Sequence, residues 1–197
     1  MYASDQGFFL GDHGWFDKRF MYEQSVQMPF LLSYPRGIPA GGTQTGIVTN
    51  VDVAQKILDA AGVDHPRMQG RSFWADLTGR SGPPPAEGLY YRYWEHDDPS
   101  HQAPARYGYR TERHKLIYFY TDGLGYPGCG DRTYPPEWEL YDLEADPEEV
   151  RNVADDPAYA AVRERLEVAL WRAQADVPHP SQPVPRGVSD LGATLGS

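Results

Sequence analysis

The second half of the chain has a pattern that restricts its fold. Four short segments rich in aromatic and apolar residues are followed by one long amphipathic segment. The long segment begins with Asp156 at the N-cap and Pro157 in the first turn, and it ends near Asp176. Strands followed by one helix favour a small antiparallel sheet covered on one face by that helix. The predicted strands are residues 89–94, 107–111, 115–120 and 138–143.

The first half has a different pattern. Residues 26–34 are predicted to form a buried strand, with Pro29 near its start. Residues from Thr49 onward offer N-cap chemistry for a helix that runs to about Ala61 and stops at Gly62. The apolar residues predicted to share one face of this helix are Val53, Ile57, Leu58 and Ala61.

A stretch rich in Gly and Pro, residues 79–88, is predicted as a linker. It divides the chain into an α/β part, residues 1–78, and a small α+β unit, residues 89–176. Residues 177–197 contain four prolines followed by Gly and Ser, which predicts a poorly ordered tail.

Composition excludes several classes of function. The net charge of −10 argues against a nucleic-acid partner. No apolar run approaches the roughly 18 residues of a membrane span. The single cysteine, Cys129, cannot form an intrachain disulfide, and no signal peptide is visible, so the compartment stays open.

The chemistry of the chain is concentrated in the run from Ser4 to Lys18. Asp5 and Gln6 are adjacent oxygen donors, which suit a hard cation such as Ca²⁺, although Ca²⁺ needs about six to eight oxygen ligands. Lys18 brings a mobile positive charge suited to an oxyanion. His13 is a candidate hydrogen-bond donor or general acid. The competing interpretation is a turn followed by a solvated basic surface, with His13 bonded only to backbone.

Several blocks together resemble the C-terminal part of the sulfatases, in the alkaline-phosphatase-like superfamily. They are similar to the branch that contains heparan N-sulfatase and iduronate sulfatase, they follow the order of that family, and they cover roughly residues 2–178. The resemblance implies the C-terminal end of an alkaline-phosphatase-like α/β sandwich, followed by the small α+β subdomain. The blocks are SDQGFFLGDHGWFDKRFMYEQSVQMPFLLSYP, VTNVDVAQKILDAAGV, MQGRSF, YGYRTERHKLIYFY and WELYDLEADPEEVRNVADDP.

The resemblance also implies roles for individual residues. Asp5 and Gln6 match two ligands of the catalytic Ca²⁺, and Lys18 matches the residue that binds the sulfate group. His13 matches the family motif, with either a catalytic or a structural role. His96 and His101 lie in a loop that approaches the substrate in such enzymes, and a surface histidine is the alternative for each.

The nucleophile of the family is not in this chain. Sulfatases convert the Cys or Ser of a Cys/Ser-x-Pro-x-Arg motif to formylglycine, whereas Cys129 lies in Gly-Cys-Gly-Asp-Arg and is interpreted as a loop thiol. We therefore expect a C-terminal portion of a sulfatase that hydrolyses the sulfate ester or N-sulfate of a sulfated small molecule or glycan. Alone it should be inactive and bind Ca²⁺ weakly, because a preceding segment or separate chain would carry the rest of the site.

Three alternatives remain open from the sequence. One is a phosphonate or phosphate ester hydrolase of the same superfamily, which shares the metal ligands. Another is a non-catalytic remnant or a binding protein. The last is a split enzyme that assembles with a separate N-terminal chain.

Overall fold

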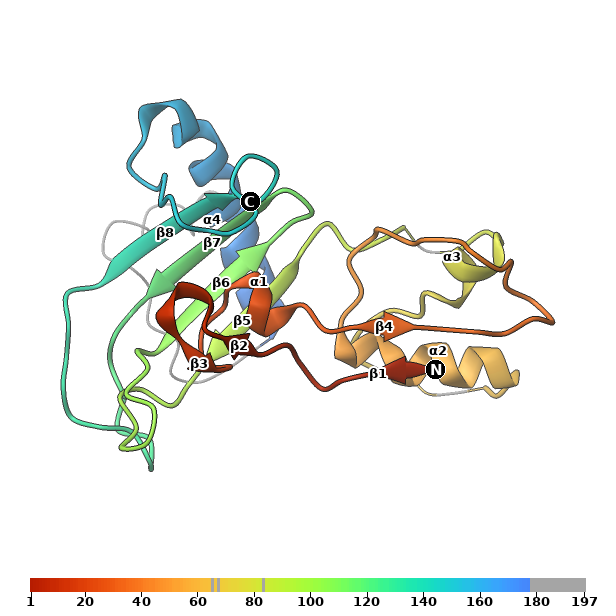
Figure 1. Cartoon of the computed structure of the whole chain (residues 1–197), viewed down its shortest axis with the longest axis horizontal. Coiled ribbons are helices and arrows are strands. Elements are labelled where there is room, and N and C mark those ends of the chain that lie inside the picture. Colours follow the sequence, from red (N-terminus) through yellow and green to blue (C-terminus); the bar gives the residue numbers. More distant parts are fainter. Residues whose placement is uncertain (65, 67, 83, 178–197) are drawn as a thin grey trace.

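The computed structural model describes residues 1–64, 66, 68–82 and 84–177. The molecule is elongated, with a four-stranded sheet at one end and the helices α2 (Val53–Ala61) and α3 (Trp74–Thr78) at the other (Figure 1). Within the described part of the chain, no helix is long and apolar enough to cross a membrane. The predicted tail lies outside the described residues except for Val177.

The four-stranded sheet confirms the pattern of the second half. Its strands are antiparallel and lie side by side in sequence order, so each connection joins neighbours. Aromatic and β-branched residues favour this pairing because their side chains pack well on a pleated surface. The strands are β5 (Leu89–Tyr93), β6 (Arg106–Arg110), β7 (His114–Phe119) and β8 (Glu137–Asp142).

Helix α4 (Ala160–Asp176) covers one face of the sheet, as the sequence predicts (Figure 1). It follows a 3₁₀ turn, η3 (Pro157–Tyr159), and the Asp156 side chain caps that turn by accepting a 3.0 Å hydrogen bond from the Ala158 N–H. Leu166 and Leu170 of α4 are buried against the sheet. The buried residues of this core are Ala105, Tyr107, Tyr109, Leu116, Tyr118, Tyr120, Leu140, Val153, Ala154, Leu166 and Leu170.

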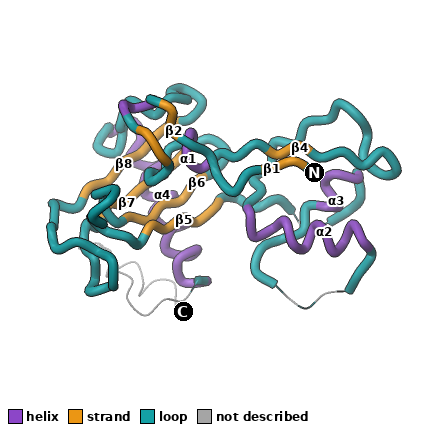
Figure 2. Tube along the Cα trace, turned by 60° about the horizontal axis from the view of Figure 1, so that its bottom comes forward, coloured by secondary structure: helices purple, strands orange, loops and turns teal. Residues whose placement is uncertain are grey.

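Residues from the beginning of the chain cover the opposite face of the sheet, which the sequence analysis did not anticipate. Phe9, Met21 and Tyr22 are buried there with Ile117 and Tyr141 of the sheet. Both views show α1 and β2 lying over the strands (Figures 1 and 2). This covering segment contains β2 (Phe9–Leu10), the 3₁₀ turn η1 (Asp12–Gly14), β3 (Phe16–Asp17) and α1 (Glu23–Val26).

The predicted strand 26–34 is mostly wrong. Only β4 (Phe30–Leu31) is a strand, because its partner β1 (Tyr2–Ala3) offers just two residues for pairing. Tyr2 and Leu31 face each other in this pair and are 66% and 67% exposed.

Helix α2 begins and ends as predicted, and Gly62 adopts the left-handed conformation (φ 67°) that stops it. The apolar face predicted for this helix is not its most buried one. Ile57 is 48% exposed, whereas Gln55 and Lys56 are buried. The Lys56 ammonium lies 5.8 and 5.9 Å from the ring centres of Phe30 and Phe73, and burial lowers its pKa.

Asp142, at the end of β8, makes the stability of the fold depend on pH because its pKa is shifted. Its carboxylate is buried and accepts hydrogen bonds from Arg113 (2.8 and 3.0 Å) and the Tyr159 hydroxyl (3.2 Å). The hydrogen bonds from Arg113 hold the pKa of Asp142 well below its usual range, and backbone N–H groups assist. Stability from this group is therefore present above the ordinary aspartate pKa of about 3.9 and is lost as the pH falls through the lower folded value.

We expect Asp142→Asn to lower the free energy of unfolding by about 1–3 kcal/mol at pH 7, because hydrogen bonds to a charged acceptor are weakened. The difference between the native chain and the variant should shrink as the pH falls below about 4, because the unfolded state then binds a proton on Asp142 that the folded state does not. Thermal unfolding measured at pH 7, 4 and 3 tests this. A difference that stays constant over this range would contradict the account.

Candidate functional site

Asp5 and Gln6 lie in a turn that follows β1. The Ser4 hydroxyl donates a 2.7 Å hydrogen bond to the Gln6 carbonyl, and the Gln6 amide donates to Asp5 Oδ2 at 3.4 Å. The two side chains predicted as metal ligands are therefore beside each other, and Asp5 is exposed. Together they present carboxylate and amide oxygens in one turn.

His13 lies in η1, the turn between β2 and β3, in a strained conformation. Its φ is +55°, between Gly11 and Gly14, whose φ values are also positive. The imidazole stacks on Tyr22, with ring centres 4.6 Å apart and an interplanar angle of 22°. His13 Nε2 is shielded and has no hydrogen-bond partner among the described residues. This unpaired ring nitrogen leaves both a catalytic and a structural role open.

Lys18 follows β3 directly, next to Asp17, which has a strained φ of +90°. The Lys18 ammonium makes no hydrogen bond or ion pair with any residue that the structure describes. Its backbone, by contrast, is held, since its carbonyl accepts a 2.7 Å hydrogen bond from the Ser25 hydroxyl. A fixed backbone with an uncommitted ammonium suits an anion-binding group.

His101 joins the segment that carries Lys18 to a distant loop. Its Nε2 lies 3.2 Å from Asp17 Oδ2 and 3.1 Å from Arg19 Nη2, while its Nδ1 lies 2.9 Å from Asp98 Oδ1. A neutral ring protonated on Nδ1 donates to Asp98 and accepts from Arg19, and a charged ring also donates to Asp17. The loop of His101 thus reaches Asp17 and Arg19, the sequence neighbours of Lys18.

His96 is not the surface histidine considered in the sequence analysis. It is fully buried, and both ring nitrogens are occupied by backbone. The Ala105 N–H donates to Nδ1 at 3.0 Å, so Nε2 carries the proton and donates to the Arg132 carbonyl at 2.5 Å. These bonds hold the loop in place, and they leave His96 without a free nitrogen for a substrate.

Sequence reasoning missed Asp17, Arg19 and Asp98. Arg19 Nε lies 3.2 Å from Asp17 Oδ2, so these residues form one cluster with His101 beside Lys18. The residues come from parts of the chain that are 82 positions apart. The only signal in the sequence was the run of charged residues Asp17, Lys18 and Arg19. Such a run does not distinguish a site from a solvated surface.

The donors fit part of a Ca²⁺ shell. Asp5 and Gln6 supply two neighbouring oxygen ligands of the kind that Ca²⁺ prefers. Among the described residues there is no group of three or more His, Cys, Asp or Glu side chains placed to hold a metal ion.

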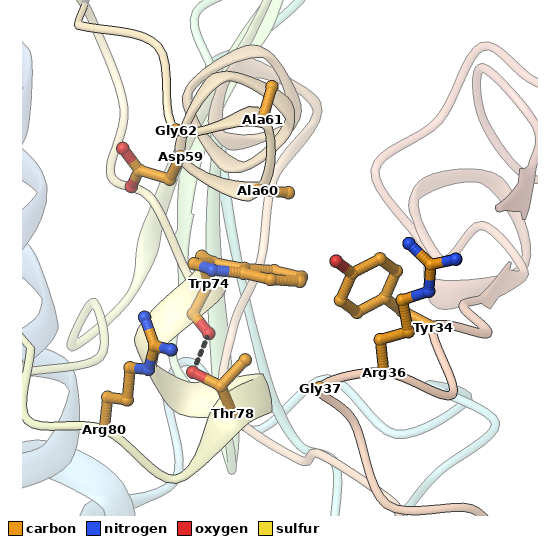
Figure 3. A pocket seen from close by; sticks show the side chains of 10 residues that line it. All are labelled: Tyr34, Arg36, Gly37, Asp59, Ala60, Ala61, Gly62, Trp74, Thr78 and Arg80. Carbon is orange, nitrogen blue, oxygen red and sulfur yellow. Dashed lines mark hydrogen bonds between the residues drawn. The ribbon is translucent and has the colours of Figure 1, made fainter.

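A hollow of about 370 Å³ lies elsewhere, between α2, α3 and the loop after β4 (Figure 3). Tyr34 and Trp74 meet edge to face in it at 5.4 Å, with Arg36 and Arg80 nearby. None of the residues predicted for the site lines this hollow. It is therefore separate from the cluster around Lys18.

The fold is that of the alkaline-phosphatase-like sulfatases. The solved structure of BT4656 in complex with its substrate, D-glucosamine-2-N,6-O-disulfate, superposes with a TM-score of 0.76 and 42% identity, over 88% of this chain and 33% of that one. A phosphonate monoester hydrolase of Agrobacterium radiobacter shares the fold, with a TM-score of 0.68 and 22% identity over 88% and 34% of the two chains.

The chain belongs to the family described as N-sulphoglucosamine sulphohydrolase, C-terminal, which matches residues 11–176. It is 43% identical over 178 residues to an N-acetylglucosamine-6-O-sulfatase of Bacteroides thetaiotaomicron. That match covers 88% of this chain but 29% of the relative, so the chain spans less than a third of that protein.

Proposed function

We propose that this chain is the C-terminal portion of a sulfatase that removes sulfate from a sulfated amino sugar. The observation that carries the proposal is the segment around Lys18. Its ammonium is uncommitted among the described residues, and its sequence neighbours Asp17 and Arg19 are joined to His101. The 43% identity to a sulfatase of N-acetylglucosamine 6-sulfate and the likeness to a complex with a disulfated glucosamine support this class of substrate.

In this proposal Lys18 binds the sulfate group. A lysine is a compact positive charge, and it stabilises negative charge that develops on the sulfuryl oxygens. Asp5 and Gln6 would hold Ca²⁺ with ligands from the rest of the enzyme. When bound, the metal would polarise a sulfuryl oxygen. The formylglycine nucleophile of the family would lie outside this chain, which would make the isolated chain inactive.

The cluster beside Lys18 supplies groups that recognise hydroxyls of a sugar ring. Asp17 accepts hydrogen bonds, Arg19 donates them, and His101 does either. Their side chains are 26%, 30% and 28% exposed, so each is held by its neighbours and still reachable by a ligand. We propose that this cluster orients the sugar while Lys18 holds the sulfate.

Asp17→Asn should therefore raise KM roughly 10-fold with a smaller change in kcat, because a hydrogen bond to a charged group contributes about 1.5–3 kcal/mol. The assay uses a hybrid enzyme, in which this chain replaces the matching segment of the Bacteroides sulfatase. Asp131→Asn is the matched control, since Asp131 is exposed and lies in another loop. If the two variants have equal kcat and KM, the cluster does not take part in substrate binding.

A phosphonate ester hydrolase is the second candidate, because the Agrobacterium enzyme shares the fold. The hybrid enzyme separates the two candidates when sulfate release from N-acetylglucosamine 6-sulfate is compared with hydrolysis of a phosphonate monoester. Faster hydrolysis of the sulfate ester supports a sulfatase. Preference for the phosphonate ester would favour the second candidate.

A further inference from the structure

Helix α1 lies between the two segments proposed to hold the metal and the sulfate. The Gly7 N–H, next to Gln6, donates a 2.8 Å hydrogen bond to the Ser25 carbonyl. The Ser25 hydroxyl donates a 2.7 Å hydrogen bond to the Lys18 carbonyl. Ser25 is 3% exposed, so both bonds are shielded from water. One residue of α1 therefore contacts the backbone of both segments.

The contact between Gly7 and α1 leaves no space for a side chain. A Cβ atom on Gly7 would lie 2.1 Å from the Gln24 carbonyl oxygen and 2.7 Å from that of Gln27. The turn that carries Asp5 and Gln6 is thus pressed directly against the backbone of α1. Movement of α1 would move this turn with it.

The first turn of α1 is fixed to the sheet by a buried group of charges. The Glu23 N–H donates to Glu149 Oε2 at 2.6 Å, and the Glu23 carboxylate lies 2.9 Å from Arg110 and 2.8 Å from Lys115. Lys115 also lies 2.6 Å from Glu149, and both side chains are fully buried. Burial raises the pKa of Glu23, but Arg110 and Lys115 outweigh it and lower that pKa overall.

The group contains two acids and two bases, of which Lys115 and Glu149 are fully buried and Glu23 and Arg110 are partly exposed. Burial raises the pKa of Glu149, and the adjacent Lys115 opposes this effect. Arg110 and Lys115 are opposite each other on β6 and β7, which gives them a fixed spacing. The group therefore ties α1 to β6 and β7 and to the loop after β8 that carries Glu149.

We propose that α1 acts as a brace in which Ser25 and Glu149 are positioning residues that set Lys18 and the Asp5–Gln6 turn relative to each other. The inference rests on the proposed function, because it assigns these residues to the same site. It gives Glu149 of the α+β subdomain a role in catalysis without contact to the substrate. A displacement of about 1 Å in such a group costs up to 100-fold in rate.

The first test is hydrogen–deuterium exchange on the chain itself, residues 1–197. Ser25→Ala removes the donor to the Lys18 carbonyl without adding volume. We expect amide exchange in residues 15–20 to become at least about 10-fold faster, with β7 and β8 unchanged. Ser33→Ala, an exposed serine, is the matched control. Unchanged exchange in residues 15–20 of the Ser25→Ala variant would overturn the brace.

Glu149→Gln provides a second variant that keeps an acceptor for the Glu23 N–H but removes one buried charge. Exchange should become faster both in residues 5–8 and in residues 15–20, because α1 contacts both segments. An increase confined to residues near Glu149, or a global increase across the sheet, would overturn the proposed coupling. This measurement requires no catalytic activity, so it is independent of the proposed function.

The second test uses the hybrid enzyme and separates positioning from mere folding. Ser25→Ala should lower kcat about 10- to 100-fold while KM changes less than 3-fold, and Ser25→Thr, which keeps the hydroxyl, should recover part of the loss. Faster exchange with an unchanged kcat would overturn the positioning role. If the unmodified hybrid folds and releases no sulfate, the proposed function fails, and the exchange experiment still decides whether the brace exists.

Discussion

Lys18→Ala in the hybrid enzyme should lower kcat for sulfate release by roughly 100- to 1,000-fold, the usual cost of losing one donor that stabilises developing negative charge. The Lys18 ammonium is uncommitted within the described residues while its backbone is held by Ser25. The substitution should therefore remove a ligand for the sulfate and leave the fold intact. Initial rates at saturating substrate, with thermal unfolding of the same sample, measure both effects.

Lys18→Arg is the matched variant for this prediction. It keeps the positive charge but replaces a compact ammonium by a planar fork, so we expect partial activity between that of the native chain and that of Lys18→Ala. Equal kcat for the alanine variant and the native chain would contradict the role of Lys18. So would a loss explained entirely by a lower unfolding temperature.

Phe9→Ala should destabilise the chain by about 3–5 kcal/mol, the usual cost of removing a buried aromatic side chain. Phe9 is fully buried, and it packs with Met21 and Ile117 on the face of the sheet opposite α4. The prediction tests whether the segment that carries His13 and Lys18 is part of the core of this chain. Denaturant unfolding followed by tryptophan fluorescence measures the change.

Leu10→Ala is the control for Phe9→Ala. Leu10 is the next residue of the same strand, but it is 78% exposed and faces away from the core. Its substitution should change the free energy of unfolding by less than about 0.5 kcal/mol. Similar losses for the two variants would mean that the segment does not pack on the sheet as described.

Local sequence patterns predicted the sheet and α4 well. The strands between Leu89 and Asp142 are rich in aromatic residues, and Asp156 with Pro157 marks the helix start, so neighbours along the chain determine these elements. The face of the sheet that Phe9 and Met21 cover could not be predicted, because the contact joins residues about a hundred positions apart.

The failures in the first half have a common physical cause. Residues 26–34 have the composition of a strand, but pairing requires a partner, and β1 supplies two residues. Helix α2 has the apolar stripe of an amphipathic helix, yet Lys56 is buried and Ile57 is exposed. Burial depends on which surface a helix meets, and the periodicity of a helix does not specify that surface.

The candidate site was only partly predictable. The spacing of Asp5, Gln6 and Lys18 is visible in the sequence because all three lie within one short run. The cluster with His101 depends on a loop that returns to this run from the C-terminal subdomain, and its geometry is not encoded locally. The assignment of metal and sulfate ligands stays a prediction.

The central claim is that this chain supplies the sulfate-binding lysine of a sulfatase. Its most direct test is the rate of sulfate release from N-acetylglucosamine 6-sulfate by the hybrid enzyme with the native chain, compared with the same hybrid carrying Lys18→Ala. The account predicts turnover with the native chain and a loss of roughly 100-fold or more with the variant. A folded hybrid without turnover, or equal turnover of the two proteins, would contradict it.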